Sequence, residues 1–206
     1  MWLSSKIIYE DSPVGKWEDF QVGNRLDTRF GGTASWNRVT DKGGAAVLSY
    51  TGGQGHSQLW DNTTVYNASD NVYIEAFVRA DGFLTTNLTG LAFGKQSGSN
   101  ANGYQVLIDR RSNAFNGSSA GFQLRRSTST GVLASQGGIS IIHSRWYRIE
   151  VNWRTTGTRI TCRLYDDTNT LLSTLTSSNS TYTSGRIGAY SYNPGSIDDI
   201  DVIVGP

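Results

Sequence analysis

The chain has 206 residues, of which 17% are charged, and its formal net charge is +1 at pH 7. This balance gives no basic field of the kind that attracts nucleic acid, and we expect no nucleic-acid partner. Hydrophobic residues make up 37% of the chain, which is too apolar for a disordered protein. No run approaches the roughly 18 apolar residues of a membrane-spanning helix, so we expect no membrane insertion.

The composition favours many short strands joined by tight turns. The chain contains 24 glycines and only three prolines, together with runs of Ser, Thr and Asn, which are typical of turn-rich β-proteins. No proline-rich or charged linker divides it. We therefore expect one β-sandwich domain over residues 1–206, with residues 1–12 as a terminal strand or an extension.

Alternating apolar and polar residues predict strands along most of the chain. In chain order they cover residues 6–10, 19–22, 34–39, 45–50, 57–61, 71–79, 90–95, 103–109, 121–126, 131–136, a hairpin over 145–166, 170–176, 186–192 and 196–204. Residues 71–79 (NVYIEAFVR) are apolar on nearly both faces, which is typical of a strand in the middle of a sheet. No fixed-period repeat is present, which argues against a propeller or a solenoid.

The clearest strand signal is the segment 145–166, in which two alternating runs are joined by residues 155–157. One phase of the two runs is apolar and consists of Tyr147, Ile149, Val151, Trp153, Ile160, Cys162 and Leu164. The other phase is polar, and we expect it to form the outer surface of a two-sheet sandwich. Cys162 is the only cysteine, and its position predicts a small buried hydrophobic residue.

Several segments, taken in order, resemble a known family. They are 17–20 (WEDF), 71–79, 90–94 (GLAFG), 103–106 (GYQV), 121–124 (GFQL), 146–151 (WYRIEV), 185–190 (GRIGAY) and 197–200 (IDDI). Together they resemble the concanavalin A-like (laminin G-like) jelly rolls over about residues 17–204. The resemblance implies an all-β, two-sheet antiparallel jelly-roll sandwich. Such modules occur as lectins, carbohydrate-binding appendages, hydrolases and parts of virions or cell surfaces, so the resemblance specifies fold better than function.

The residue types needed for carbohydrate binding are present on the predicted central strands. Aromatic rings stack on the apolar face of a sugar, while planar amides, guanidinium groups and carboxylates bind its hydroxyls. The candidates are Tyr73, Glu75, Gln105, Asp109, Gln123, Arg125, Arg148, Glu150 and Asn152, with Trp60 and Tyr104 near loops. If these strands are neighbours in one concave sheet, the side chains converge in a single groove. The alternative is an ordinary solvated sheet face.

These observations predict a non-catalytic module that recognises a polysaccharide on a concave sheet face, in an extracellular, cell-surface or virion setting. The first alternative is a structural virion or cell-surface assembly module, such as a decoration or filament subunit. Its self-association would use the apolar N-terminal segment 2–9 as a strand that pairs with a neighbouring chain.

A second alternative is a glycoside hydrolase or lyase, which rests on analogy of fold. A glycosidase needs two carboxylates flanking one bond, and the Glu-x-Asp-x-x-Glu pattern of the glucanase branch does not occur. Glu75 and Glu150 lie mid-strand in half-polar settings. They form either a catalytic pair or ion pairs with Arg79, Arg125 or Arg148. We favour ion pairing or hydrogen bonding to a ligand, and we therefore expect a binding protein rather than an enzyme.

A structural calcium ion is the remaining cofactor candidate, because hard cations prefer carboxylate and carbonyl oxygens. The resemblance implies an ion between the first and last strands, where Asp19, Asp198 and Asp199 are the candidate ligands. Solvated acids in turns are the alternative. His56 and His143 have no partners at zinc-site spacing, and we expect both at the surface. No nucleophile-elbow motif supports a Ser-His-Asp triad.

Overall fold

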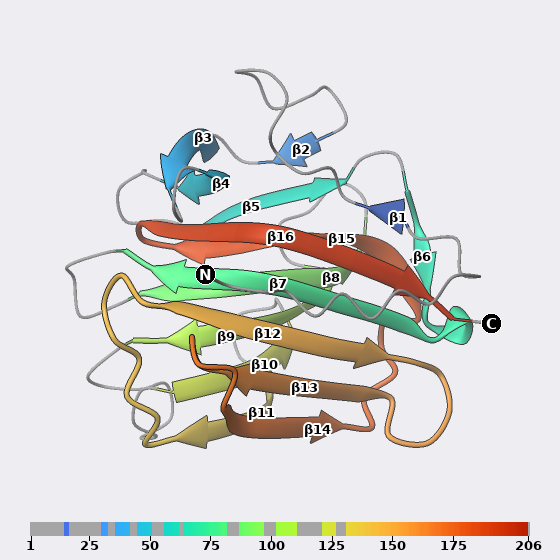
Figure 1. The fold of residues 1–206 in the computed structure, drawn as a ribbon. Helices are drawn as coiled ribbons and strands as arrows, with labels where there is room; N and C mark the ends of the chain where they lie inside the picture. The colour runs from blue at the N-terminus through green and yellow to red at the C-terminus, as the bar shows by residue number, and fades with distance from the viewer. Residues whose placement is uncertain are drawn as a thin grey trace.

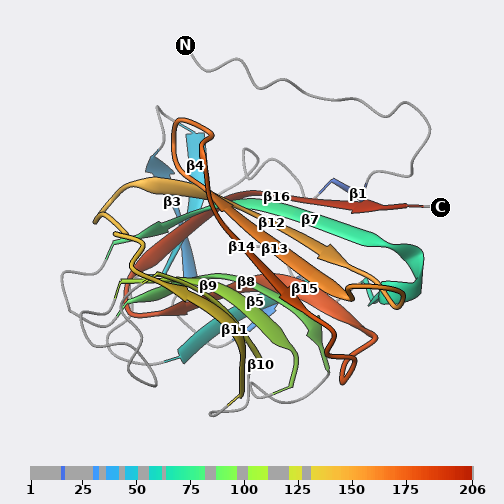
Figure 2. The same cartoon turned by 90° about the horizontal axis from the view of Figure 1, so that it is seen from below.

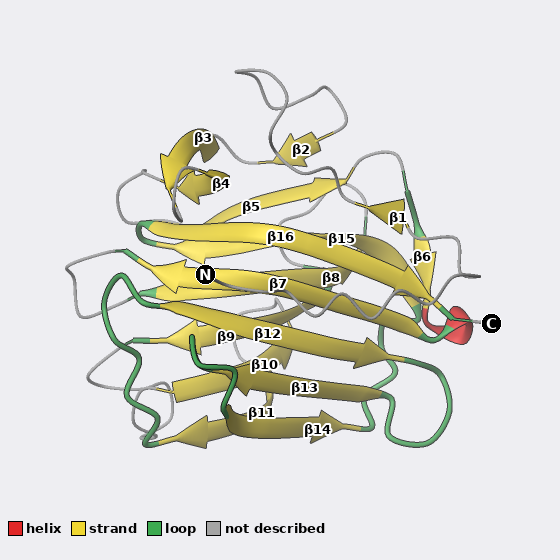
Figure 3. Cartoon of the chain, viewed as in Figure 1, coloured by secondary structure: helices red, strands yellow, loops and turns green. Residues whose placement is uncertain are grey.

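The structure is a computed structural model. It describes residues 15–16, 30–32, 36–41, 45–50, 56–61, 64–81, 87–96, 102–110, 121–126 and 131–205, with side chains from residue 58 onward. The described strands form two antiparallel sheets that lie face to face as two layers (Figure 1, Figure 2). Among the described residues, the regular secondary structure is strand apart from one short 3-10 helix at Ala68–Asp70 (Figure 3). No helix in these ranges is long and apolar enough to cross a membrane.

The first layer, called sheet A, contains the strands nearest both ends of the described chain. Its order is β14 (Leu171–Ser177), β13 (Ile160–Tyr165), β12 (Trp146–Trp153), β7 (Val72–Ala80), β16 (Gly195–Val204), β4 (Ala45–Tyr50) and β3 (Trp36–Asp41), and β1 (Gly15–Lys16) pairs with β16. The doubly apolar segment predicted for the middle of a sheet is β7, which pairs with β12 on one side and β16 on the other. That prediction is confirmed.

The second layer, called sheet B, lies beneath sheet A in the view of Figure 2. Its order is β11 (Gly131–Gly137), β10 (Gly121–Arg126), β9 (Tyr104–Asp109), β8 (Leu88–Lys95), β15 (Ser184–Tyr192), β5 (His56–Asp61) and β2 (Phe30–Gly32), and β6 (Tyr66–Asn67) pairs with β15. The edge strands β11 and β14 lie against each other and close one side of the sandwich (Figure 1).

The β12–β13 hairpin follows the predicted alternation. Val151 pairs with Cys162 and Trp153 with Ile160, and these four residues are buried in the core between the sheets. The thiol of Cys162 is free and fully buried, as expected for a small hydrophobic residue. The loop is wider than the predicted turn at 155–157, because the amide of Arg154 donates to the carbonyl of Arg159 across it at 2.8 Å.

The inner faces of both sheets contribute to one apolar core. Ile74 and Val78 come from sheet A, and Leu91, Val106 and Phe122 come from sheet B. Burial of this apolar surface is the main force that holds two such layers together, at roughly 25 cal/mol for each Å² removed from water. Inward-pointing residues alternate with outward-pointing ones on each strand, so each sheet also has an outer face that points away from the other sheet.

Most strands were predictable, and the short ones were not. Two or three residues cannot show an alternation, so β1, β2 and β6 have no counterpart among the predicted strands. The predicted strands at 6–10 and 19–22 lie outside the described residues, as does the N-terminal segment 2–9 proposed for self-association.

Candidate functional site

The predicted binding residues do not share one face. Tyr73, Glu75, Arg148, Glu150 and Asn152 lie on β7 and β12 and point outward from sheet A. Trp60, Gln105, Asp109, Gln123 and Arg125 lie on β5, β9 and β10 of sheet B and point outward from the opposite side of the sandwich. The expectation of a single groove that contains both groups is therefore wrong. Period-two alternation separates inward from outward positions, but it carries no information on which sheet a strand joins.

Tyr104 lies in neither group. Its ring is fully buried in the core, 5.2 Å from the rings of Phe93 and Tyr182. Its hydroxyl donates to Asn179 at 2.7 Å and accepts from the amide of Tyr182 at 3.0 Å. Tyr104 therefore fastens the loop before β15 to the core, and it offers no ring surface to a ligand.

On the outer face of sheet A, the two candidate carboxylates are held by one guanidinium group. Glu150 and Glu75 are direct cross-strand partners. The Nη1 atom of Arg148 lies 3.0 Å from Glu75 and also donates to Glu150. Two like charges in facing positions repel each other, and a shared cation between them converts the repulsion into attraction. The ion-pair alternative for these two glutamates is confirmed, with Arg148 as the partner.

Two tyrosines complete this network. Tyr73 donates to Glu75 at 2.8 Å, and Tyr165 donates to Glu150 at 3.1 Å while its ring lies 4.0 Å from the guanidinium carbon of Arg148. Burial, and then the charge of Glu75, raise the pKa of Tyr73 far above its ordinary value. Burial and the neighbouring Glu150 also raise the pKa of Tyr165. Both phenols therefore remain protonated donors, and the carboxylates of this face already bind groups of the protein itself.

The outer face of sheet B has a different construction. The strand register places its residues in rows that run across the sheet. One row contains Arg125, Gln105, Ala92, Gly188 and Trp60, and the next contains Gln123, Leu107, Gly90, Tyr190 and Gln58. In both rows the positions on β8 are the small residues Ala92 and Gly90, which lie between residues of β9 and β10 on one side and residues of β15 and β5 on the other.

A small apolar cluster lies on this side of sheet B. Leu88, Ala92, Leu107 and Tyr190 form it, separate from the main core; all four are buried, and Tyr192 packs against them. Arg125 reaches across β9 and β8, because its Nη2 atom donates to the hydroxyl of Tyr190 on β15 at 2.8 Å. The half-buried side chains of this face include Trp60 and Tyr192.

Strand β10 carries two hydrogen-bonding atoms that the protein leaves unused. Gln123 donates through Nε2 to Asp109 at 2.6 Å, but its carbonyl oxygen Oε1 is buried without a hydrogen-bond partner. Arg125 donates through Nε to Gln105 at 2.8 Å and through Nη2 to Tyr190, which leaves its Nη1 without a hydrogen bond to any described group. An unused acceptor and an unused donor thus lie two residues apart on one face.

Three contributors to this face, Tyr190, Tyr192 and Lys95, were not among the candidates. Gly188, Tyr190 and Tyr192 are two residues apart in the predicted strand 186–192 and therefore point to the same face. This spacing could have identified the two tyrosines as outward-facing residues. Lys95 follows Gly94, whose φ of +61° breaks the alternation of β8. Its ammonium group lies 4.8 Å from the ring of Trp60. Because Gly94 shifts the phase, the direction of the Lys95 side chain could not be read from the strand pattern.

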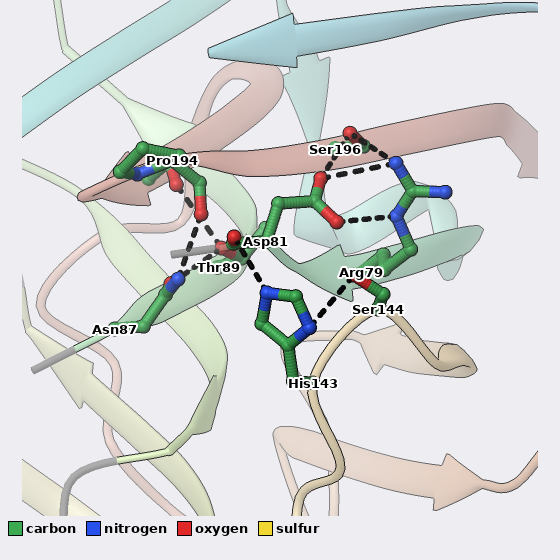
Figure 4. Close-up of polar contacts among 9 residues, drawn as sticks. Arg79, Asp81, Asn87, Thr89, His143, Ser144, Pro194 and Ser196 are labelled. Atoms are coloured by element: carbon green, nitrogen blue, oxygen red, sulfur yellow. Dashed lines mark hydrogen bonds and ion pairs between the residues drawn. The ribbon is translucent and has the colours of Figure 1, made fainter. Parts of the chain in front are cut away.

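A polar cluster at the end of β7 brings a serine, a histidine and an aspartate together (Figure 4). Ser144 hydrogen-bonds Nδ1 of His143 at 3.0 Å, and Nε2 of His143 lies 2.9 Å from the main-chain oxygen of Asp81. The carboxylate of Asp81 instead accepts from Arg79 and Ser196. A hydrolytic triad needs the carboxylate on the histidine, so this cluster fastens the crossover from sheet B to the ends of β7 and β16. His143 is part-buried rather than a free surface side chain, and the side chain of His56 lies outside the described residues.

Two of the three predicted calcium ligands, Asp198 and Asp199, lie in the described part of the chain. Asp198 is buried and Asp199 is exposed at a bulge of β16. Over the part of the chain that the structure describes, no three His, Cys, Asp or Glu side chains gather in a way that would hold a metal ion. Asp19, the third predicted ligand, lies outside that part.

Comparison with known proteins identifies the fold. No protein-family model and no curated protein matches the chain, but solved structures do. The Lotus tetragonolobus seed lectin superposes with a TM-score of 0.63 at 10% identity, over 89% of this chain and 97% of the lectin. The carbohydrate-binding module CBM66 from Bacillus subtilis gives 0.56 at 14% identity, over 86% and 92% of the two chains.

A third match is the exoplasmic/lumenal domain of VIP36 in its Ca²⁺/Man3GlcNAc-bound form, with a TM-score of 0.61 at 8% identity, over 86% of this chain and 84% of the domain. All three identities are too low to carry a function. The shared architecture, across nearly the whole of each structure, shows that this chain has the concanavalin A-like jelly-roll fold of lectins and carbohydrate-binding modules.

Proposed function

We propose that the protein is a non-catalytic glycan-binding module, and that the glycan binds on the outer face of sheet B. The observation that carries this proposal is the pair of unused atoms on β10, the acceptor Oε1 of Gln123 and the donor Nη1 of Arg125. A buried polar atom without a partner costs about 1–3 kcal/mol. A ligand that supplies a donor to Gln123 recovers that energy.

Neighbouring hydroxyls of a sugar suit this pair, because each hydroxyl both donates and accepts a hydrogen bond. Leu88, Leu107 and Tyr190 lie beside the pair but are almost fully buried, with exposures of 3%, 0% and 1%. Trp60 and Tyr192 are half-buried, and their rings supply the surface on which the C–H face of a pyranose ring packs. Polar groups near exposed ring surface match the two-sided chemistry of a carbohydrate.

The outer face of sheet A is the weaker candidate. Glu75 and Glu150 are bound by Arg148 and by two tyrosines, so a sugar hydroxyl would have to replace existing charge-assisted hydrogen bonds. On sheet B, by contrast, a ligand adds hydrogen bonds that the protein does not make for itself. Several structural neighbours are lectins or carbohydrate-binding modules, which supports a glycan ligand in general and does not specify which face binds it.

The expected extracellular, cell-surface or virion location belongs to this proposal. Its support is that one structural neighbour is an exoplasmic/lumenal domain. The assembly alternative is also supported by one observation. Leu171 and Ile142 are about half exposed, and within the described strands β14 pairs only with β13. Light scattering across a concentration series discriminates, since an assembly module forms larger particles and a binding module stays monomeric.

The proposal is tested by affinity gel electrophoresis on a panel of neutral and acidic polysaccharides. Gln123→Ala removes the unused acceptor, and we expect it to weaken binding roughly three- to tenfold. Asn152→Ala is the matched control, because Asn152 is an amide on the outward face of a central strand of sheet A. Thermal unfolding checks that both variants are folded. Equal binding by Gln123→Ala and the unaltered protein would remove this face from the account.

A further inference from the structure

A cavity of about 310 Å³ lies where the crossover from β11 to β12 meets the turn between β13 and β14 (Figure 1). It is lined by Ile139, Ser140, Arg145, Tyr147, Asp166 and Leu172. Tyr147 belongs to the apolar core, and Ile139 and Leu172 pack against that core. The cavity therefore lies at one end of the layer between the two sheets, and not on the outer face of either sheet.

The crossover forms one wall of the cavity and is held to the sandwich by hydrogen bonds. The amide of Ile142 donates to the hydroxyl of Tyr147 at 2.9 Å, and this hydroxyl donates to the carbonyl of Ser140 at 3.5 Å. Two residues beyond Ile142, the amide of Ser144 donates to the carbonyl of Ala80 at 3.1 Å. The wall is therefore formed before a ligand arrives, so binding does not have to order it.

The opposite wall is a turn built around Asp166. Its Oδ1 atom accepts hydrogen bonds from the amide and hydroxyl of Thr168, at 3.0 and 2.7 Å, and from the amide of Thr170 at 2.9 Å. The amide of Asp166 also donates to the carbonyl of Thr170 at 3.0 Å. The hydrogen bonds from Thr168 and Thr170 hold the pKa of Asp166 below its ordinary value. This carboxylate is therefore a fixed, ionised acceptor at neutral pH.

Arg145 joins the two walls and keeps part of its hydrogen-bonding capacity. Its Nη2 atom donates to Asp167 and lies 3.6 Å from Oδ2 of Asp166, which is too long for a hydrogen bond. Its Nη1 atom makes no hydrogen bond to a described group, and Oδ2 of Asp166 accepts none from one. Ser140, beside them, is exposed. The cavity thus offers a cationic donor, an anionic acceptor and a hydroxyl.

The charges and size of the cavity narrow the class of ligand. Arg145 and the two aspartates together carry a net negative charge, which repels an anion, and Arg145 repels a cation. A neutral hydroxyl can donate to a carboxylate or accept from a guanidinium group, in both cases with charge assistance. The side chains of Ile139 and Leu172 supply apolar walls. A volume of about 310 Å³ is at the small end of ligand pockets, which suits one ring.

We propose that this cavity is a second carbohydrate site, which binds one neutral sugar residue between Arg145 and Asp166. Adjacent hydroxyls of the sugar bond to Oδ2 of Asp166 and Nη1 of Arg145, and the C–H groups of the ring lie against Ile139 and Leu172. As a carbohydrate site it rests on the proposed glycan-binding function. It shares no residue with the outer face of sheet B, so the two sites can fail separately.

The test is a backbone-amide NMR titration with the neutral monosaccharides glucose, galactose, mannose, fucose and xylose. We expect at least one of them to bind with a Kd in the millimolar range or tighter, with chemical-shift changes centred on residues 139–145 and 166–172. The uronic acid and the amino sugar of the same configuration as the best ligand are then titrated. Both are expected to bind at least tenfold more weakly than the neutral sugar.

Two variants and a matched control locate the binding. Ser140→Trp fills the cavity from an exposed position and is expected to abolish monosaccharide binding. Ser178→Trp is the control, because Ser178 is an exposed serine six residues from Leu172, about 20 Å away along β14. Asp166→Asn retains an Oδ1 acceptor for the turn and replaces Oδ2 by a donor, and is expected to weaken binding at least tenfold. Thermal unfolding checks that each variant is folded.

The contrary outcomes separate this site from the outer face of sheet B. If the folded Ser140→Trp variant bound the sugar as well as the unaltered protein, the cavity would not be the site. Failure of every monosaccharide to bind, with polysaccharide binding retained, would refute the cavity and leave the proposed function standing. Tighter binding of the uronic acid or the amino sugar would refute a neutral ligand. Absence of binding to every monosaccharide and polysaccharide would refute both proposals.

Discussion

Glu75 and Glu150 face each other across β7 and β12, and the guanidinium group of Arg148 binds both. All three side chains are at least three-quarters shielded from solvent, with exposures of 25%, 10% and 16%. Because facing like charges destabilise a sheet, this arrangement depends on the arginine. The arginine therefore holds the centre of sheet A together.

Arg148→Gln is expected to destabilise the fold by about 1–3 kcal/mol, because it leaves two shielded carboxylates opposite each other with only the more exposed Arg163, 3.5 Å from Glu150, as a nearby cation. The measurement is urea-induced unfolding at pH 7. In a Glu75→Gln background the same change should have a smaller effect, since the repulsion has already been removed. Equal losses in the two backgrounds would show that Arg148 does not act through this pair.

The tyrosines predict how stability depends on alkaline pH. Burial is the main cause that raises the pKa values of Tyr73, Tyr104, Tyr147 and Tyr165 in the folded chain. In the unfolded chain these phenols lose their protons near pH 10. Above that pH the unfolded state binds fewer protons than the folded state, so stability is fully present below about pH 10 and falls as the pH rises further.

Absorbance at 295 nm follows phenolate formation and tests this directly. In the folded protein a group of tyrosines should ionise only at pH values well above 10, whereas in guanidinium chloride all should ionise near pH 10. Tyr73→Phe should reduce the late-ionising group by one. Superposition of the folded and unfolded titration curves would contradict the burial of these phenols.

Gly188 is required for the close approach of β15 and β5. A Cβ atom at this position would lie 1.8 Å from the main-chain oxygen of Leu59, so the backbone of one strand must move. Gly188→Ala is therefore expected to cost more than about 3 kcal/mol or to prevent folding. Gly157 is the control: it has a φ of +62° in an open loop, and Gly157→Ala should cost only about 1 kcal/mol. Comparable thermal unfolding temperatures for the two variants would refute the packing argument.

The strand pattern predicted inward and outward positions well where one phase is polar. In β12 the apolar phase of Tyr147, Ile149 and Val151 is buried, as expected. In strand β9 the two phases do not differ in burial, because all six of its residues are buried. Tyr104 was predicted to be a binding aromatic near a loop, although its ring belongs to the core.

The assignment of strands to sheets was beyond sequence reasoning. Strands β7 and β8 are consecutive in the chain but lie in different sheets, and β11 and β12 are separated in the same way. Each crossover moves the next polar face to the other side of the molecule. Gln105 and Glu150 both look like outward polar groups on central strands, yet the sandwich separates them. Only long-range pairing, which local periodicity does not report, decides between one site and two.

The central claim is that ligand binds the outer face of sheet B and not that of sheet A. The most direct measurement is a backbone-amide NMR titration of the full chain with oligosaccharides of the polymer that binds most tightly. The account predicts chemical-shift changes concentrated on β8, β9, β10 and β15, around Gln105, Gln123 and Tyr190, with β12 and β13 unchanged. Shifts centred on Arg148 and Glu150 instead would contradict it.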